Sequence, residues 1–191
     1  MRRLLAASAT TAVCTALALT AHPGAATASA HRPGPNETGQ NRLAAPARSG
    51  IAHLSGVADL QPTASDTWTN TGLRVVLTRP GTYALDADVR ARLSGVPPVN
   101  TYIVARLWNV TDGAALSDSE RLCNQIIDSN AGDALTGQNT TVPISERITV
   151  TGPTIIELQA ERINAAGASA VASIFSDVHG RTSLRFEQIA P

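Results

Sequence analysis

Apolar and polar residues alternate along residues 83–93 of the chain. Apolar side chains occupy the odd positions: Tyr83, Leu85, Ala87, Val89, Ala91 and Leu93. Charged side chains occupy the even positions from 86 onward: Asp86, Asp88, Arg90 and Arg92. Because successive side chains of a strand point to opposite faces, the alternation predicts a long β-strand with one buried and one solvated face. A strand of this kind is typical of antiparallel sheets in sandwiches and barrels.

Further strands are predicted on both sides of this one. Residues 51–60 form a first strand or an adhering arm. The other strands are expected at 67–69, 73–78, 101–109, 116–127, 140–144, 147–150, 154–164, 170–175 and 182–189. Residues 117–120 could instead begin a short helical turn, and 128–138 form the longest loop. Turn residues recur roughly every 8–15 residues and no long helical period interrupts them, which predicts an all-β, two-sheet β-sandwich.

The strand at 154–164 repeats the alternation. Its apolar residues, predicted to face the core, are Ile156, Leu158 and Ala160, and its polar residues, predicted to face outward, are Glu157, Gln159 and Glu161. Opposite charges on facing strands pair favourably, so these glutamates are candidate partners of Arg90 and Arg92. The alternative, a cation shared by the neighbouring Asp86 and Asp88, is weaker because the arginines continue the same stripe.

The first thirty residues have the pattern of a signal peptide. Arg2 and Arg3 precede an apolar run to Thr20, and 28–30 reads Ala-Ser-Ala, a typical signal-peptidase site. Threonines dilute the run and His22-Pro23-Gly24 ends it early, which argues against a transmembrane anchor. The arginine pair also suits twin-arginine export, but ordinary secretion is favoured. We therefore expect an extracellular protein, free or associated with the cell wall, with no membrane insertion after cleavage.

Composition changes again after the signal. Residues 31–50 are rich in Pro and Gly, as in a disordered linker, and 51–191 are long enough for one domain. Cleavage leaves 13 arginines against 15 acidic residues, hence a formal charge of −2. That balance argues against non-specific binding to nucleic acid or anionic membrane. The chain has no lysine, which we interpret as the codon bias of a GC-rich bacterium.

Three short motifs carry a resemblance to a known family. They are Pro80-Gly81-Thr82-Tyr83 before the alternating strand, Thr151-Gly152-Pro153-Thr154 before another, and the closing run at 180–186. Over residues 68–190 the chain resembles the complement-component and tumour-necrosis-factor-like jelly rolls, including bacterial and phage members. The resemblance implies a jelly-roll topology of about ten strands that often trimerises and binds proteins or glycans. It supplies no common catalytic residues.

One cluster of residues could be read as a hydrolase site. Asp177 and His179 lie near Ser173 and Ser176, the residue types of a nucleophile, its base and an orienting acid. A hairpin turn explains the same residues, because Asp and a His-Gly pair are common at hairpin tips. The chain lacks a Gly-x-Ser-x-Gly elbow, so the turn is favoured and no catalytic residue is predicted.

Candidate ligands for metals are few. Asp128, Asn130 and Asp133 offer oxygens for calcium, but their spacing is not that of a recognised calcium loop. After signal cleavage the remaining histidines and Cys123 are too far apart for a zinc site, so neither a metal nor a cofactor is predicted. The only other cysteine, Cys14, is removed with the signal peptide, so the mature chain has no internal disulfide. Cys123 is then either a small buried residue, which we favour, or the site of an intermolecular disulfide.

The strand at 101–109 is apolar on both faces. One face carries Ile103, Ala105 and Leu107, and the other carries Tyr102, Val104, Arg106 and Trp108. Since the outer face of a sandwich normally meets water, the second face requires a cover. The cover is either the arm at 51–60 or another copy of the chain. Aromatic residues mixed with Arg are typical of protein interfaces, so we expect these four residues at the contact of a homotrimer.

Together these patterns predict a secreted, non-enzymatic jelly-roll module for binding or assembly. Its protein or glycan ligand is not identified by the sequence. The alternatives are a small extracellular hydrolase or glycan-active enzyme and a structural component of the cell surface.

Overall fold

The computed structural model describes residues 48–191, and in that region the chain is built of strands without a helix. The predicted signal peptide and nearly all of the linker lie outside the described residues. The first sheet, sheet A, contains β1 (Ser49–His53), β2 (Val57–Asp59), β4 (Gly81–Gly95), β8 (Thr136–Val150), β10 (Ser169–Phe175) and β11 (Ser183–Ala190). The second, sheet B, contains β3 (Thr69–Leu77), β5 (Val99–Asn109), β6 (Ala114–Ala115), β7 (Arg121–Asp128) and β9 (Thr154–Ala166). In this part of the chain no helix is long and apolar enough to cross a membrane.

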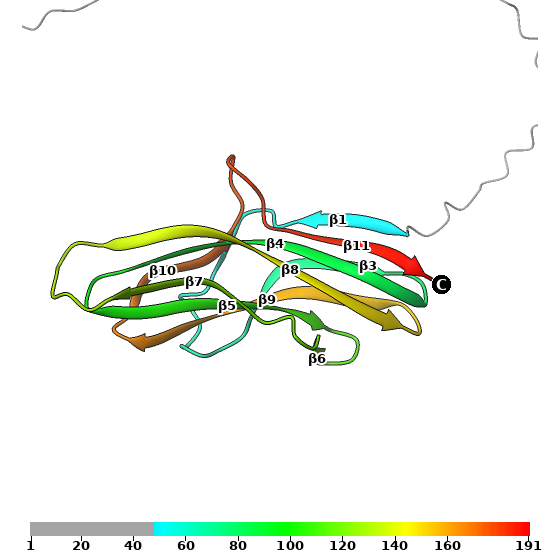
Figure 1. Ribbon diagram of the computed structural model, residues 1–191, viewed down its shortest axis with the longest axis horizontal. Coiled ribbons are helices and arrows are strands. Elements are labelled where there is room, and N and C mark those ends of the chain that lie inside the picture. Colours follow the sequence, from blue (N-terminus) through cyan, green and yellow to red (C-terminus); the bar gives the residue numbers. More distant parts are fainter. Residues whose placement is uncertain (1–47) are drawn as a thin grey trace, which may run out of the picture. The chain divides into compact units, whose positions relative to one another are not determined.

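The long strand β4 organises sheet A. Strand β8 pairs antiparallel with β4 along all fifteen residues of each strand, and β11 and β10 pair one after the other with its opposite edge. β1 extends the sheet beyond β11 (Figure 1), and β2 extends it beyond β10. In sheet B, β9 lies between β3 and β5, and β5 also pairs with β7 and β6. The chain passes from one sheet to the other at β2–β3, β3–β4, β4–β5, β7–β8, β8–β9 and β9–β10, which confirms the predicted two-sheet sandwich with jelly-roll topology.

The core lies between the two sheets and contains the odd positions of β4. Tyr83, Leu85 and Val89 are fully buried there, as the alternation predicts. Tyr83 also tilts toward the ring of Phe186, 6.1 Å between centroids, and its hydroxyl donates to the Arg79 carbonyl oxygen at 3.0 Å. The aromatic ring is thus buried with its polar end satisfied.

Strand β8 is longer than the sequence indicated. Residues 136–150 form one strand, although two short strands and part of a loop were expected there. Pro143 lies in the middle, opposite Asp88 of β4. Because β8 is an edge strand, the missing N–H of proline can lie on the side that has no strand to pair with.

The segment at 116–127 also differs from its prediction. Residues 116–120 form a turn, and the strand begins at Arg121. The Ser119 side chain stabilises the turn: its Oγ accepts from the Leu107 N–H at 3.1 Å and donates to the Leu116 carbonyl at 2.8 Å. These local bonds to the backbone replace strand pairing in this stretch.

The segment at 51–60 joins sheet A rather than covering the face of the strand at 101–109. Its two strands, β1 and β2, pair with β11 and β10. The arm is therefore not the cover that the doubly apolar strand β5 requires.

Candidate functional site

The outer face of sheet B contains all four predicted interface residues. Tyr102, Val104, Arg106 and Trp108 alternate with buried residues along β5, and each is partly exposed. Across to β9, their cross-strand partners are Ile163, Glu161, Gln159 and Glu157, in that order. Cross-strand partners share a face of the sheet, so these side chains form one surface.

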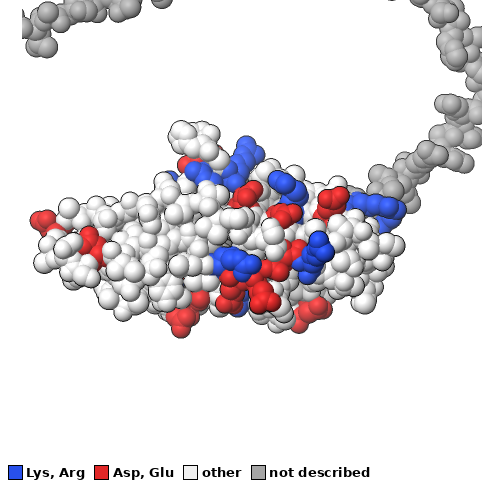
Figure 2. Space-filling model, viewed as in Figure 1, with Lys and Arg blue, Asp and Glu red and all other residues white. Residues whose placement is uncertain are grey.

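An apolar patch occupies one half of this surface. It consists of Tyr102, Val104, Leu122, Ile127 and Ile163, which we call the β5–β7 patch. Leu122 lies opposite Val104 and is 52% exposed, and Ile127 is 65% exposed. No member of the patch is charged, and the end of the molecule that carries the β4–β5 and β7–β8 connections shows few charged side chains (Figure 2). Exposed apolar side chains that gather on one face are typical of a contact surface.

A second group of residues on the same face holds Arg106 in place. The guanidinium carbon lies 3.8 Å from the ring centroid of Trp68 and 4.7 Å from that of Trp108. Nε and Nη2 donate to Oε1 of Gln159 at 3.1 and 3.0 Å, and Nη1 lies 3.4 Å from Oε1 of Glu120. We call Arg106 and the four residues around it, Trp68, Trp108, Glu120 and Gln159, the tryptophan clamp. Since Arg106 is satisfied within its own chain, it contributes little further bonding capacity to a partner.

The outward polar residues of β9 have the predicted orientation, but two of them are not solvated. Glu157 and Glu161 are each only 7% exposed. Glu157 accepts hydrogen bonds from the amides of Asn70 and Gln159. Burial raises the pKa of Glu161, the nearby carboxylates of Asp66 and Glu120 raise it further, and Arg106 opposes them.

The predicted pairing of these glutamates with Arg90 and Arg92 is wrong. The arginines lie on β4 in sheet A, whereas Glu157 and Glu161 lie on the outer face of sheet B. Arg90 pairs instead with Asp177, with Nη1 2.6 Å from Oδ1, and it also donates to the Gly180 carbonyl. Both arginines stack on the ring of Phe175, at 4.5 and 4.4 Å from its centroid.

The residues of the suspected hydrolase site form a turn. Oδ1 of Asp177 accepts from Arg90 and from the backbone N–H of His179, and neither bond involves the imidazole of His179. The hydrogen bond from Arg90 holds the pKa of Asp177 below its usual value. Ser176 Oγ accepts from the Thr182 N–H, which closes the base of the loop. The loop is therefore organised by backbone bonds and one ion pair, in agreement with the turn interpretation.

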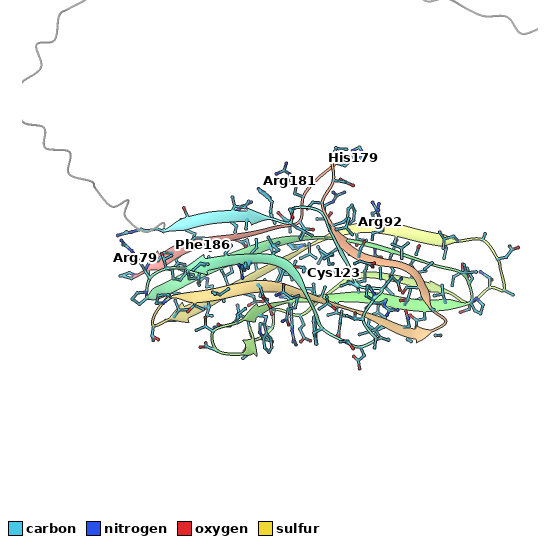
Figure 3. All side chains as sticks on the ribbon, turned by 180° about the vertical axis from the view of Figure 1, so that it is seen from behind. Arg79, Arg92, Cys123, His179, Arg181 and Phe186 are labelled. Carbon is cyan, nitrogen blue, oxygen red and sulfur yellow. The ribbon has the colours of Figure 1, made fainter. Side chains whose placement is uncertain are left out.

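Cys123 is buried in the core, 2% exposed, and lies between the two layers (Figure 3). Burial raises the pKa of its thiol to about 12. A buried, protonated thiol is a poor nucleophile and cannot reach a second chain without local unfolding.

In the loop proposed for calcium, Asp128 Oδ1 accepts from the backbone and side chain of Asn130. Within residues 48–191, no three His, Cys, Asp or Glu side chains lie together in a way that could hold a metal.

Sequence reasoning missed Leu122 and Ile127, the two most exposed residues of the patch. The two residues differ by an odd number of positions, so simple alternation places them on opposite faces. A β-bulge between Leu122 and Asn124 inserts Cys123 as an extra residue and brings both to the outer face. Nothing in the local sequence announces this bulge.

Comparisons with known proteins show a likeness in fold only. No family model matches the chain, and no curated protein matches it. Similar solved structures include infectious bursal disease virus Gt strain, 14% identical over 73% of this chain and 32% of the viral chain, with a TM-score of 0.45. They also include the VP2 subviral particle of that virus (14% identical, 73% and 32% covered, TM-score 0.39) and Eiger TNF from S. frugiperda (12% identical, 74% and 85% covered, TM-score 0.34). The chain spans about a third of these viral chains.

Proposed function

We propose that this protein is a secreted, non-enzymatic assembly module that forms a homotrimer through the β5–β7 patch. The observation that carries the proposal is the exposure of Leu122 and Ile127 beside Tyr102 and Val104 on one face. Burying such side chains against a partner removes apolar area from water, worth about 25 cal/mol per Å² before the costs of association.

A second copy of the chain is the partner that this surface suits. None of the five patch residues is charged, and Glu161, which lies beside Val104, is only 7% exposed, so bringing two or three patches together creates little repulsion between like charges. The formal charge of the secreted chain, −2 after the expected cleavage, also opposes association only weakly. Soluble chains that self-associate usually do so with closed symmetry.

The clamp belongs at the rim of this contact. Arg106 and Trp108, expected at the contact from sequence, are held by Trp68, Gln159 and Glu120. We therefore place Tyr102 and Val104 near the centre and Arg106 and Trp108 at the edge. Which protein or glycan the assembled module would bind is not part of this proposal.

Light scattering coupled to size-exclusion chromatography tests the proposal. The secreted protein at about tens of micromolar is expected to have three times the mass of one chain, and Leu122→Asp is expected to give a monomer, because a charge in an apolar contact lacks a partner. The control is Val76→Asp on β3, which changes a residue of similar exposure (46% against 52% for Leu122) in the same sheet outside the patch and should stay trimeric. A monomeric wild-type protein would end the proposal.

A further inference from the structure

A cleft opens where the edge of sheet A divides. β1 pairs with β11 as far as His53, and β2 pairs with β10 from Val57 onward. The three residues between them face the β10–β11 loop, and the space between the two segments is about 480 Å³. Its polar lining comes from His53 and Ser55 on one side and from Ser176, Asp177 and Arg181 on the other.

Backbone hydrogen bonds hold both walls of this cleft. The Leu54 N–H donates to the Thr182 carbonyl and the Ser176 N–H donates to the Gly56 carbonyl, each at 2.9 Å. Thr182 is fully buried, and its hydroxyl donates to the Phe175 carbonyl at 2.8 Å. The cleft is therefore formed in advance, so a ligand would not have to order its walls.

The charge of the cleft is positive. Its one carboxylate, Asp177, is neutralised by Arg90 at 2.6 Å. Arg181 is exposed and has no ion pair among residues 48–191. Figure 3 shows its side chain projecting beside the loop, on the side opposite Arg92 and below the tip that carries His179.

We propose that this cleft binds the oxyanion of a small extracellular ligand, a carboxylate or a phosphate. The guanidinium of Arg181 presents paired N–H donors that match either group. The hydroxyl of Ser176 accepts from the Thr182 N–H, so its own hydrogen is free to donate to the anion. His53 and Ser55 offer further donors from the opposite wall.

The loop also offers apolar contact to the rest of such a ligand. Val178, at the tip beside the cleft, is 95% exposed, and Leu54 lies at the base of the cleft. A ligand with an anionic group and an apolar portion would use both kinds of contact. The cleft belongs to sheet A, whereas the β5–β7 patch belongs to sheet B, so this site does not depend on the proposed assembly.

Titration of the ¹⁵N-labelled secreted protein, followed by TROSY spectra at constant ionic strength, tests the site. The probes are inorganic phosphate in one arm and sodium acetate in the other, with chloride as the compensating ion. We expect saturable shifts at the amides of Ser55 and of residues 176–181. Tighter binding of one probe identifies the preferred oxyanion, and equal binding supports the shared chemistry.

Two matched variants separate a built site from general attraction. Arg181→Gln should weaken binding about tenfold, the value expected for the loss of one charge-assisted contact. Arg74→Gln removes the same charge from the exposed face of β3 in the other sheet and should leave binding unchanged. Shifts that do not saturate with either probe, or equal losses in the two variants, would overturn the proposal.

Discussion

Leu85 and Asp86 are adjacent in the chain but lie in opposite environments. Leu85 is fully buried between the sheets, whereas Asp86 is exposed and accepts a hydrogen bond from Ser145 Oγ at 2.7 Å. Leu85→Asp is expected to unfold the domain, because deleting a core side chain costs about 2–5 kcal/mol of the roughly 5–15 available and a buried charge costs more. Asp86→Asn should change stability little. Thermal denaturation measures both, and equal melting temperatures would contradict the assignment of faces.

Cys123 gives the stability a dependence on alkaline pH. Its thiol pKa is raised from 9.0 to about 12 by burial, so the folded state holds the proton more tightly than the unfolded chain. The contribution is fully present below about pH 9 and is lost as the pH rises toward 12. Between about pH 8 and pH 10.5 the wild type should lose about 2 kcal/mol more of its unfolding free energy than Cys123→Ala. Urea denaturation at both pH values provides the measurement, and identical losses would show that the thiol is not buried.

At the scale of elements, the β10–β11 loop is a well-fastened loop between two strands that lie end to end along the same edge of β4. β10 and β11 pair in turn with the same edge of β4, and between them the chain leaves the sheet and returns (Figure 1). Arg90 fastens the loop through Asp177 and the Gly180 carbonyl. The loop is therefore held from the sheet below it as well as by its own turn.

Arg90→Gln should loosen this loop. We expect faster amide hydrogen exchange across residues 176–181, because the ion pair and the bond to Gly180 are both lost. Arg92→Gln is the matched control: Arg92 stacks on Phe175 as Arg90 does, but its side chain bonds to Asn139 of β8 rather than to the loop. Equal exchange in the two variants would mean that stacking on Phe175, not the ion pair, orders the loop.

The strands show how far periodicity carries a prediction. The faces of β4, β5 and β9 were predicted correctly, because alternation is a property of each strand alone. No faces were assigned to β7 from the sequence, and its bulge at Cys123 arises from its pairing with β5. β8 was divided in two, since its polar sequence became one strand only by pairing along the whole of β4.

At the scale of the whole molecule, the chain is expected to leave the cell without its first thirty residues. N-terminal sequencing of protein from the culture medium should begin at His31, because Ala28-Ser29-Ala30 provides the small residues that signal peptidase requires. Protein that still begins at Met1 would contradict secretion by this route. This prediction lies outside the described residues and rests on the sequence alone.

Part of the candidate site was accessible from sequence. The doubly apolar strand β5 identified Tyr102 and Val104, because a surface strand with two apolar faces requires a cover whatever its neighbours are. The clamp was not predictable: Trp68 lies 38 positions before Arg106 in the chain, and only the packing of β3 beside β9 brings it over the guanidinium. The cleft beside Arg181 was not predictable for the same reason, because its two walls, residues 53–55 and 176–181, lie far apart in the chain.

The sequence alone determined the local properties: which residues of β4, β5 and β9 point inward, where turns interrupt them, and that the class is an all-β sandwich. Only the tertiary structure decided which strands became neighbours. It placed residues 51–60 on sheet A and buried Glu157 and Glu161 despite their outward orientation. It also paired Arg90 with Asp177 rather than with either glutamate. The physical reason is range: a period of two is set by the backbone of each strand, whereas burial and ion pairing depend on side chains from distant segments of the chain.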